Sequence, residues 1–113
     1  QDFYASTRPA TLNGADGIIF VVDSQKQYLQ DNIQSWNELQ KHYADNFQKL
    51  PVIICLNKQD LPDIISKQEI FHYLNLSTVN KIDVIQTVAI TGEGVIESFK
   101  KMLSFVFPAI IIR

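Results

Sequence analysis

The sequence has little cysteine, little glycine and no long apolar run. Its one cysteine, Cys55, has no partner for an internal disulfide and lies inside an apolar stretch, which is typical of a small buried residue in a reducing compartment. No segment reaches the roughly 20 continuous apolar residues that a membrane-spanning helix needs. We therefore expect a globular, soluble protein of the cytoplasm with no membrane span.

Neither sign of charge dominates. Ten basic and twelve acidic residues are mixed along the 113-residue chain and give a net charge of −2. We expect no nucleic-acid partner, because proteins that bind a phosphate backbone concentrate basic residues on one face. The first ten residues lack the basic stretch and apolar core of a signal peptide, and the last ones, FPAIIIR, lack a cysteine for prenylation. The length allows one domain or part of one.

Three apolar segments have the character of strands. They are residues 17–22 (GIIFVV), 52–57 (VIICLN) and 83–89 (DVIQTVA). The first two are apolar throughout, which predicts burial on both faces of the strand. Pro51 precedes the second strand, where its missing N–H does no harm.

Segments with helical periodicity lie between these strands and after the last of them. Between residues 27 and 47 the apolar residues form one stripe, from which Leu39 deviates; the stripe consists of Leu29, Ile33, Trp36, Tyr43 and Phe47. Ser66 and Glu69 have capping-box spacing and predict the start of a short helix. After a turn permitted by Gly92 and Gly94, a last helix is predicted to place five apolar residues on one face: Val95, Phe99, Met102, Leu103 and Val106.

The alternation of strands and helices predicts an α/β fold, with a parallel sheet wrapped by helices on both faces. Right-handed crossovers bring the carboxyl ends of all the strands to one edge of that sheet. Ligands of open α/β sheets bind at this edge. Any functional side chains are therefore expected in the loops that follow the strands.

Polar residues follow the second strand at this edge. Asn57, Lys58 and Asp60 come directly after it, and residues 87–91 follow the third strand. A carboxylate accepts two parallel hydrogen bonds, which guanine offers from its ring N–H and exocyclic amine, whereas adenine has the opposite polarity there. Asp60 can therefore select guanine, while the Lys58 stem lies over the purine face. The Asn57 amide can meet the base and tie the two loops together.

These residues resemble the signature of Ras-like small GTPases. NKQD is similar to their Asn-Lys-x-Asp guanine-specificity motif, and TVAITGEGV is similar to their Thr-Ser-Ala-Lys-Thr-Gly loop. The resemblance implies that the Ala89 backbone N–H meets the guanine carbonyl oxygen. Val88 and Ile90 stand where those relatives have Ser and Lys, so any contact of those side chains is lost. Ile90 is expected to pack against the base as an apolar wall.

The stretch QDFYASTRPATLNGADGIIFVVDSQ resembles the region of the bacterial gliding-motility GTPases, the MglA family, that runs from switch II into the next strand. Gln1 then matches the catalytic glutamine that orients the attacking water, and residues 2–12 match the mobile switch II segment. For the full-length protein, the resemblance implies GTP and GDP binding, Mg²⁺-assisted GTP hydrolysis and a roadblock-type regulatory partner.

The chain contains no Gly-x-x-x-x-Gly-Lys-Ser/Thr loop and no Asp-x-x-Gly ahead of Gln1. We therefore interpret residues 1–113 as the C-terminal portion of a single small GTPase domain, an incomplete three-layer P-loop GTPase-type fold without catalysis of its own. A GTPase-like scaffold that turns over no nucleotide is the alternative. Because the phosphate-loop strand of the family pairs with residues 17–22, we expect an open apolar edge there and self-association of the chain.

Overall fold

The computed structural model describes residues 16–107, and in this part of the chain three parallel strands form one sheet. The strands are β1 (Ile18–Asp23), β2 (Val52–Asn57) and β3 (Ile82–Gln86), in the order β1-β2-β3. The register pairs Asp23 with Asn57 and Leu56 with Gln86, so the strands end side by side. This arrangement confirms the predicted parallel sheet with its carboxyl ends at one edge.

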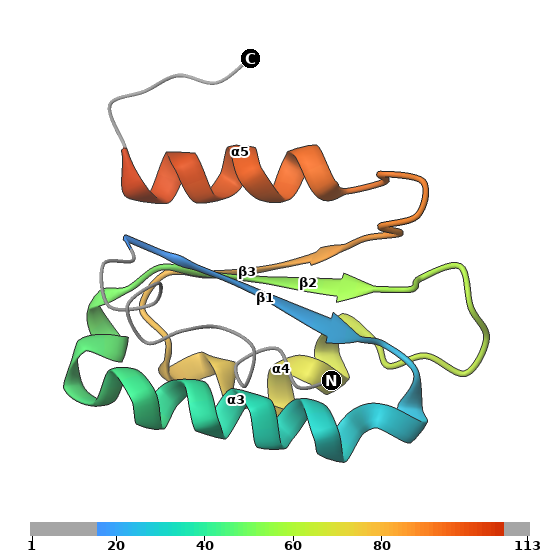
Figure 1. The fold of residues 1–113 in the computed structure, drawn as a ribbon, viewed down its shortest axis with the longest axis horizontal. Coiled ribbons are helices and arrows are strands. Elements are labelled where there is room, and N and C mark those ends of the chain that lie inside the picture. Colours follow the sequence, from blue (N-terminus) through green and yellow to red (C-terminus); the bar gives the residue numbers. More distant parts are fainter. Residues whose placement is uncertain (1–15, 108–113) are drawn as a thin grey trace.

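Helices cover both faces of the sheet and make the fold three-layered (Figure 1). Helices α3 (Leu29–Tyr43) and α4 (Lys67–Tyr73) lie on one face, and α5 (Val95–Val106) lies on the other. Three short 3₁₀ helices complete the elements of residues 16–107: η1 (Lys26–Tyr28), η2 (Ala44–Lys49) and η3 (Leu76–Thr78). The α/β class predicted from the sequence is confirmed.

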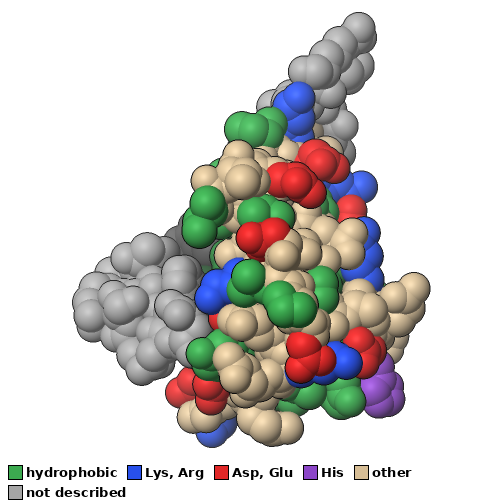
Figure 2. Space-filling model, turned by 90° about the vertical axis from the view of Figure 1, so that its right-hand side faces the viewer, with side chains coloured by type: hydrophobic (Ala, Val, Ile, Leu, Met, Phe, Trp, Pro, Cys, Tyr) green, Lys and Arg blue, Asp and Glu red, His purple; other side chains and the backbone are tan. Residues whose placement is uncertain are grey.

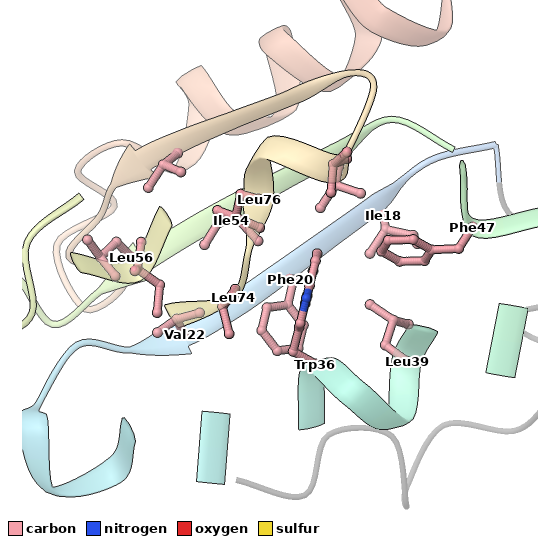
Figure 3. Packing of buried hydrophobic residues seen from close by; sticks show 14 of the residues in the cluster. Ile18, Phe20, Val22, Trp36, Leu39, Phe47, Ile54, Leu56, Leu74 and Leu76 are labelled. Atoms are coloured by element: carbon pink, nitrogen blue, oxygen red, sulfur yellow. The ribbon is translucent and has the colours of Figure 1, made fainter. Parts of the chain in front are cut away.

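The main core lies between the sheet and α3 (Figure 3). Trp36 stands between Phe20 and Phe47, with ring centroids 5.2 Å and 5.3 Å away and both pairs in edge-to-face geometry, which is favourable for aromatic rings. Leu39 is buried beside them, so its predicted deviation from the helical stripe is wrong. Leu39 follows Trp36 by three residues and precedes Tyr43 by four, which puts all three on one face of the helix.

The predicted helix over residues 27–47 is divided into three elements. After η1, helix α3 ends at Tyr43, because Ala44 takes a positive φ of 49° that breaks the helical path. Phe47 is buried as predicted, but it comes from η2. The short helix predicted from Ser66 is α4, and both hydrogen bonds of its capping box are present.

Helix α5 contacts the sheet with only part of the predicted face, because Met102 packs there as predicted but Ser98 takes the most buried position. Ser98 is buried against β2 and accepts a hydrogen bond from the buried Cys55 thiol at 3.2 Å, and Met102 packs on Gly17. Phe99 and Leu103, predicted to face the core, are 55% and 42% exposed among the described residues. Lys101 pairs with Asp83 of β3 at 3.9 Å. The helix is therefore rotated so that its apolar flank points away from β3.

Two strands also depart from prediction. Val21 of β1 is 51% exposed, so within residues 16–107 this strand is not buried on both faces. Strand β3 ends at Gln86 instead of residue 89. The chain leaves the sheet there because the Val88 N–H donates to the Glu93 carbonyl and closes a turn.

Candidate functional site

The polar loops predicted to form a site lie at the carboxyl edge of the sheet. This edge faces the viewer in Figure 2, where acidic, basic and apolar side chains are interspersed. One loop follows β2 and the other joins β3 to α5. Gly92 and Gly94 have φ of 85° and 77°, which confirms their predicted role in the turn.

Asn57 ties the two loops together, as predicted. Its side-chain oxygen accepts hydrogen bonds from the Thr87 hydroxyl at 3.0 Å and from the Ala89 backbone N–H at 2.9 Å. The Asn57 amide nitrogen has no acceptor among the described residues. That nitrogen remains available as a donor to a ligand.

Lys58 reaches across to the end of β1. Its backbone φ is 64°, and its ammonium lies 3.0 Å from the Asp23 carboxylate, which is itself largely buried. Burial opposes ionisation of Asp23, but hydrogen bonds from Lys58 and Gln25 outweigh it and hold the pKa of Asp23 below its ordinary value. The hydrogen bond to Asp23 correspondingly raises the pKa of Lys58. Both groups are charged at neutral pH.

The next two residues differ in their environment. The Gln59 amide donates to the Ser24 hydroxyl at 2.9 Å and accepts from the Gln86 amide at 2.9 Å. Gln59 therefore links the ends of β1 and β3 across the loop of β2. Asp60 is exposed and makes no hydrogen bond within residues 16–107, so its carboxylate can accept two donors from a ligand.

The loop that joins β3 to α5 offers one backbone N–H, that of Ala89, and one exposed side chain, that of Ile90. Val88 is buried and points into the protein, whereas Ile90 is 96% exposed at the tip. The predicted packing of Ile90 against a base remains a prediction. The Ala89 N–H, expected to meet a carbonyl oxygen of the base, donates to Asn57 in this structure. To accept a hydrogen bond from the Ala89 N–H, a base would have to displace the Asn57 oxygen or share the hydrogen with it.

Sequence reasoning missed Asp23, Ser24, Gln59 and Gln86. The available signal was positional, because Asp23 and Ser24 are the first polar residues after an apolar strand that lies beside β2. Such residues meet the neighbouring loop when parallel strands end together. Gln1 lies outside the described residues, so its catalytic assignment stays a prediction.

Three of the predicted site residues offer groups of different kinds to a ligand. Asp60 offers two acceptor oxygens, the Asn57 amide nitrogen offers a donor, and the Lys58 stem offers a flat aliphatic surface. No group of three or more His, Cys, Asp or Glu residues within 16–107 is placed to hold a metal ion. Mg²⁺ commonly takes only one or two protein carboxylates and otherwise binds phosphate oxygens. In the same range, each helix is too short or too polar to cross a bilayer.

Comparison with known proteins agrees with this geometry. The model of the ADP-ribosylation factor family matches residues 10–106. The mutual gliding-motility protein MglA of Myxococcus xanthus is 34% identical over 109 residues, which cover 94% of this chain and 54% of that protein. ADP-ribosylation factor-like protein 14 of Mus musculus is 32% identical over 96 residues, covering 80% of this chain and 49% of that protein.

A third relative, the GTP-binding protein ypt3 of Schizosaccharomyces pombe, is 29% identical over 110 residues, covering 95% of this chain and 49% of that protein. The chain thus spans about half the length of these curated relatives. The family match covers most of the chain. The chain therefore belongs to the ADP-ribosylation factor family of Ras-like small GTPases.

Proposed function

We propose that this chain is the guanine-reading, C-terminal portion of an MglA-like small GTPase, a GTP-binding molecular switch. Family membership supports guanine-nucleotide binding. The observation that carries the proposal for these residues is twofold: the Asp60 carboxylate has no hydrogen-bond partner within residues 16–107, and the Asn57 side chain already ties the two loops together. Val88 and Ile90 replace the polar residues of the usual motif, but a backbone contact by Ala89 survives both changes.

Each residue has one role in the proposed site. Asp60 accepts the ring N–H and the exocyclic amine of guanine, and adenine cannot supply that pair of donors. The Asn57 amide nitrogen donates to the base, and the Lys58 stem lies along the purine face. The Ala89 N–H turns from Asn57 to the carbonyl oxygen of guanine. Ile90 closes over the base as an apolar wall.

The remaining functions belong to the longer protein. Mg²⁺ bound with GTP would neutralise phosphate charge during hydrolysis. Gln1 would orient the attacking water, and its neighbours would form the switch segment that responds to the nucleotide. A roadblock-type regulatory protein is the partner that the similarity to MglA suggests.

The base-reading claim is tested by nucleotide titration of this chain, followed by the amide signals of Asn57 and Ala89 in NMR spectra. We expect guanosine diphosphate to shift these signals at lower concentration than inosine diphosphate, which lacks the exocyclic amine, or adenosine diphosphate. Asp60→Asn should remove about tenfold or more of the guanine preference, since a bidentate base contact gives discrimination of that order. Asp63→Asn, three residues further on, is the matched control and should bind as the wild type does.

The alternative is a scaffold that holds no nucleotide. Calorimetric titration of a chain extended through the missing half of the relatives' length distinguishes the two. A switch GTPase should bind guanosine diphosphate in a Mg²⁺-dependent manner. Absence of any such binding would favour the scaffold and refute the proposed function.

A further inference from the structure

Asp23 has a fixed position at the end of β1. Its carboxylate accepts hydrogen bonds from the backbone N–H and the side-chain amide of Gln25, both at 3.1 Å, and its backbone carbonyl accepts from Asn32 of α3 at 2.8 Å. Its register partner on β2 is Asn57. The sheet and the first helix thus hold one carboxylate directly beside the base-reading loop.

Two carboxylates, those of Asp23 and Asp60, are candidate partners for the Lys58 ammonium. Asp60 follows it by two residues in the same turn, which is closed by the Leu61 N–H donating to the Lys58 carbonyl at 3.1 Å. The ammonium nevertheless contacts Asp23, at 3.0 Å. Asp23 also stabilises the charged form of Lys58 more strongly than Asp60 does. As a result, Asp60 remains without a hydrogen-bonded partner in the described part of the chain.

Pairing of Lys58 with Asp23 instead of Asp60 affects how Asp60 can bind a base. If the Lys58 ammonium paired with Asp60, it would occupy carboxylate oxygens that must accept two donors from guanine. It would also draw the lysine stem away from the ends of β1 and β2. A charged hydrogen bond to Asp23 avoids both effects, because it stretches the side chain across the ends of two strands.

We propose that Asp23 is a positioning residue for guanine recognition: it holds the Lys58 ammonium away from Asp60 and so keeps the Asp60 carboxylate free for the base. The inference rests on the proposed guanine site. Its specific consequence concerns the exocyclic amine of guanine, one of the two groups that Asp60 reads. Removing Asp23 should therefore affect guanine more than hypoxanthine, which lacks that amine.

Titration of the 113-residue chain with guanosine, inosine and adenosine diphosphates tests this inference. Asp23→Asn should weaken guanosine diphosphate binding about five- to tenfold, the range expected for loss of a partly exposed charged hydrogen bond. The ratio of guanosine to inosine affinity should fall with it. Asp23→Glu, which keeps the charge, should restore part of that ratio.

A double substitution separates positioning from general damage. Lys58→Met keeps an aliphatic stem but has no charge to misplace, so adding Asp23→Asn to it should leave the guanosine-to-inosine ratio unchanged. Asp63 offers the matched control, because it pairs with Lys26 at 3.8 Å on the exposed surface and Asp63→Asn should leave the ratio at the wild-type value. Gln25→Ala removes a hydrogen bond to Asp23 but keeps its carboxylate, so it should lower the guanosine-to-inosine ratio by less. This variant replaces Asp23→Asn in the test if Asp23→Asn does not fold.

Two results would overturn the inference. One is a guanosine-to-inosine ratio that Asp23→Asn and Gln25→Ala leave intact. The other is an equal fall in the ratio when Lys58 is already Met. If instead a chain extended through the rest of the relatives' length fails to prefer guanosine over adenosine diphosphate, the proposed function itself is wrong, and the inference falls with it.

Discussion

The polar side chains of the loop after β2 fall into two groups. The Asn57 oxygen, Lys58 and Gln59 have partners within the protein, whereas Asp60 and the Asn57 amide nitrogen have none among the described residues. The first group fixes the loops, and the second is left to meet a ligand. Fixing the loops in advance reduces the conformational entropy that binding must remove.

The ion pair between Asp23 and Lys58 predicts a pH-dependent contribution to stability. The folded state lowers the pKa of Asp23, so the stabilisation is present above the ordinary pKa of Asp and is lost as pH falls through the lowered value. It raises the pKa of Lys58, so the stabilisation is lost again as pH rises through that raised value. The contribution should be constant between about pH 5 and pH 9.

Urea denaturation across this pH range, at one protein concentration, checks the prediction. Asp23→Asn should lower the midpoint on the plateau and reduce the further loss in acid. Asp31→Asn, an exposed acid in the first turn of α3, provides the comparison. If Asp23→Asn leaves the loss of stability in acid unchanged, the ion pair makes no pH-dependent contribution to stability.

The sequence alone predicts a site at Asn57, Lys58 and Asp60, because these residues form one short motif at the end of an apolar strand. It could not identify Asp23 or Gln59 as partners. Their contacts join residues about 35 positions apart, and they follow from the register of β1 against β2. An alternating hydrophobic pattern can specify register, but β2 is buried on both faces and has no such alternation.

The turn between β3 and α5 offers a paired test of its two glycines. A Cβ on Gly94 would collide with the Gln86 carbonyl oxygen and approach Thr87, whereas a Cβ on Gly92 would meet nothing within 4 Å. Both residues have positive φ, so Gly92→Ala should cost about 1–2 kcal/mol. Gly94→Ala should cost about 1–3 kcal/mol more, because a neighbouring backbone must also shift.

Urea midpoints at matched protein concentration measure both variants. The variant at Gly94 should also shift the amide signal of Ala89, since Gln86 and Thr87 lead into that loop. Equal destabilisation by the two substitutions would mean that the steric contact with Gln86 relaxes without cost.

Helix α4 depends on its capping box. Ser66 accepts a hydrogen bond from the Glu69 N–H at 3.1 Å, and the Glu69 carboxylate accepts from the Ser66 N–H at 2.9 Å. Ser66→Ala should destabilise the fold by about 1 kcal/mol, which urea denaturation can measure. Ser104→Ala, inside α5, is the control and should cost nothing, because Ala favours a helix interior. A midpoint unchanged by Ser66→Ala would contradict the prediction.

Periodicity predicted the helices better than their orientation. A repeat of three and four residues reveals that a helix is amphipathic, but several overlapping stripes can satisfy it. In α3 the buried stripe includes Leu39, and in α5 the contact with the sheet passes through Ser98 instead of Phe99. Ser98 is buried because Cys55 and the Gly94 carbonyl satisfy its hydroxyl, a pairing that only tertiary structure reveals.

The outer edge of β1 and the apolar flank of α5 are both exposed. In residues 16–107, β1 pairs with β2 alone. The N–H groups of Ile18 and Ser24 face β2, so the alternation of the ladder turns the backbone groups of Ile19 and Val21 outward. Four apolar side chains are exposed on this flank and this strand: Val21, Ile96, Phe99 and Leu103.

The other edge of the sheet is better protected. On β3 the Asp83 carboxylate accepts a hydrogen bond from the Val84 N–H at 2.8 Å and pairs with Lys101. Charged side chains of this kind discourage pairing with a further strand. Association of the chain should therefore proceed through β1 and not through β3.

We accordingly predict that the 113-residue chain self-associates in solution, which sedimentation velocity can measure. Val21→Lys should weaken the association, because Val21 is exposed on the edge strand and a charge there opposes strand pairing. Gln86→Lys, which adds the same charge to β3, should not. A monomeric, cooperatively folded wild-type chain would contradict the prediction.

The hydrogen bond from Ala89 to Asn57 has a consequence for exchange with solvent. Ala89 lies on an exposed loop, where an amide proton would ordinarily exchange rapidly with deuterium, yet the Asn57 side chain, at the end of the neighbouring strand, holds that proton. Protection of this amide therefore measures whether the two loops are joined. A base that takes over the same proton keeps it protected, and a base that only loosens Asn57 leaves it to exchange.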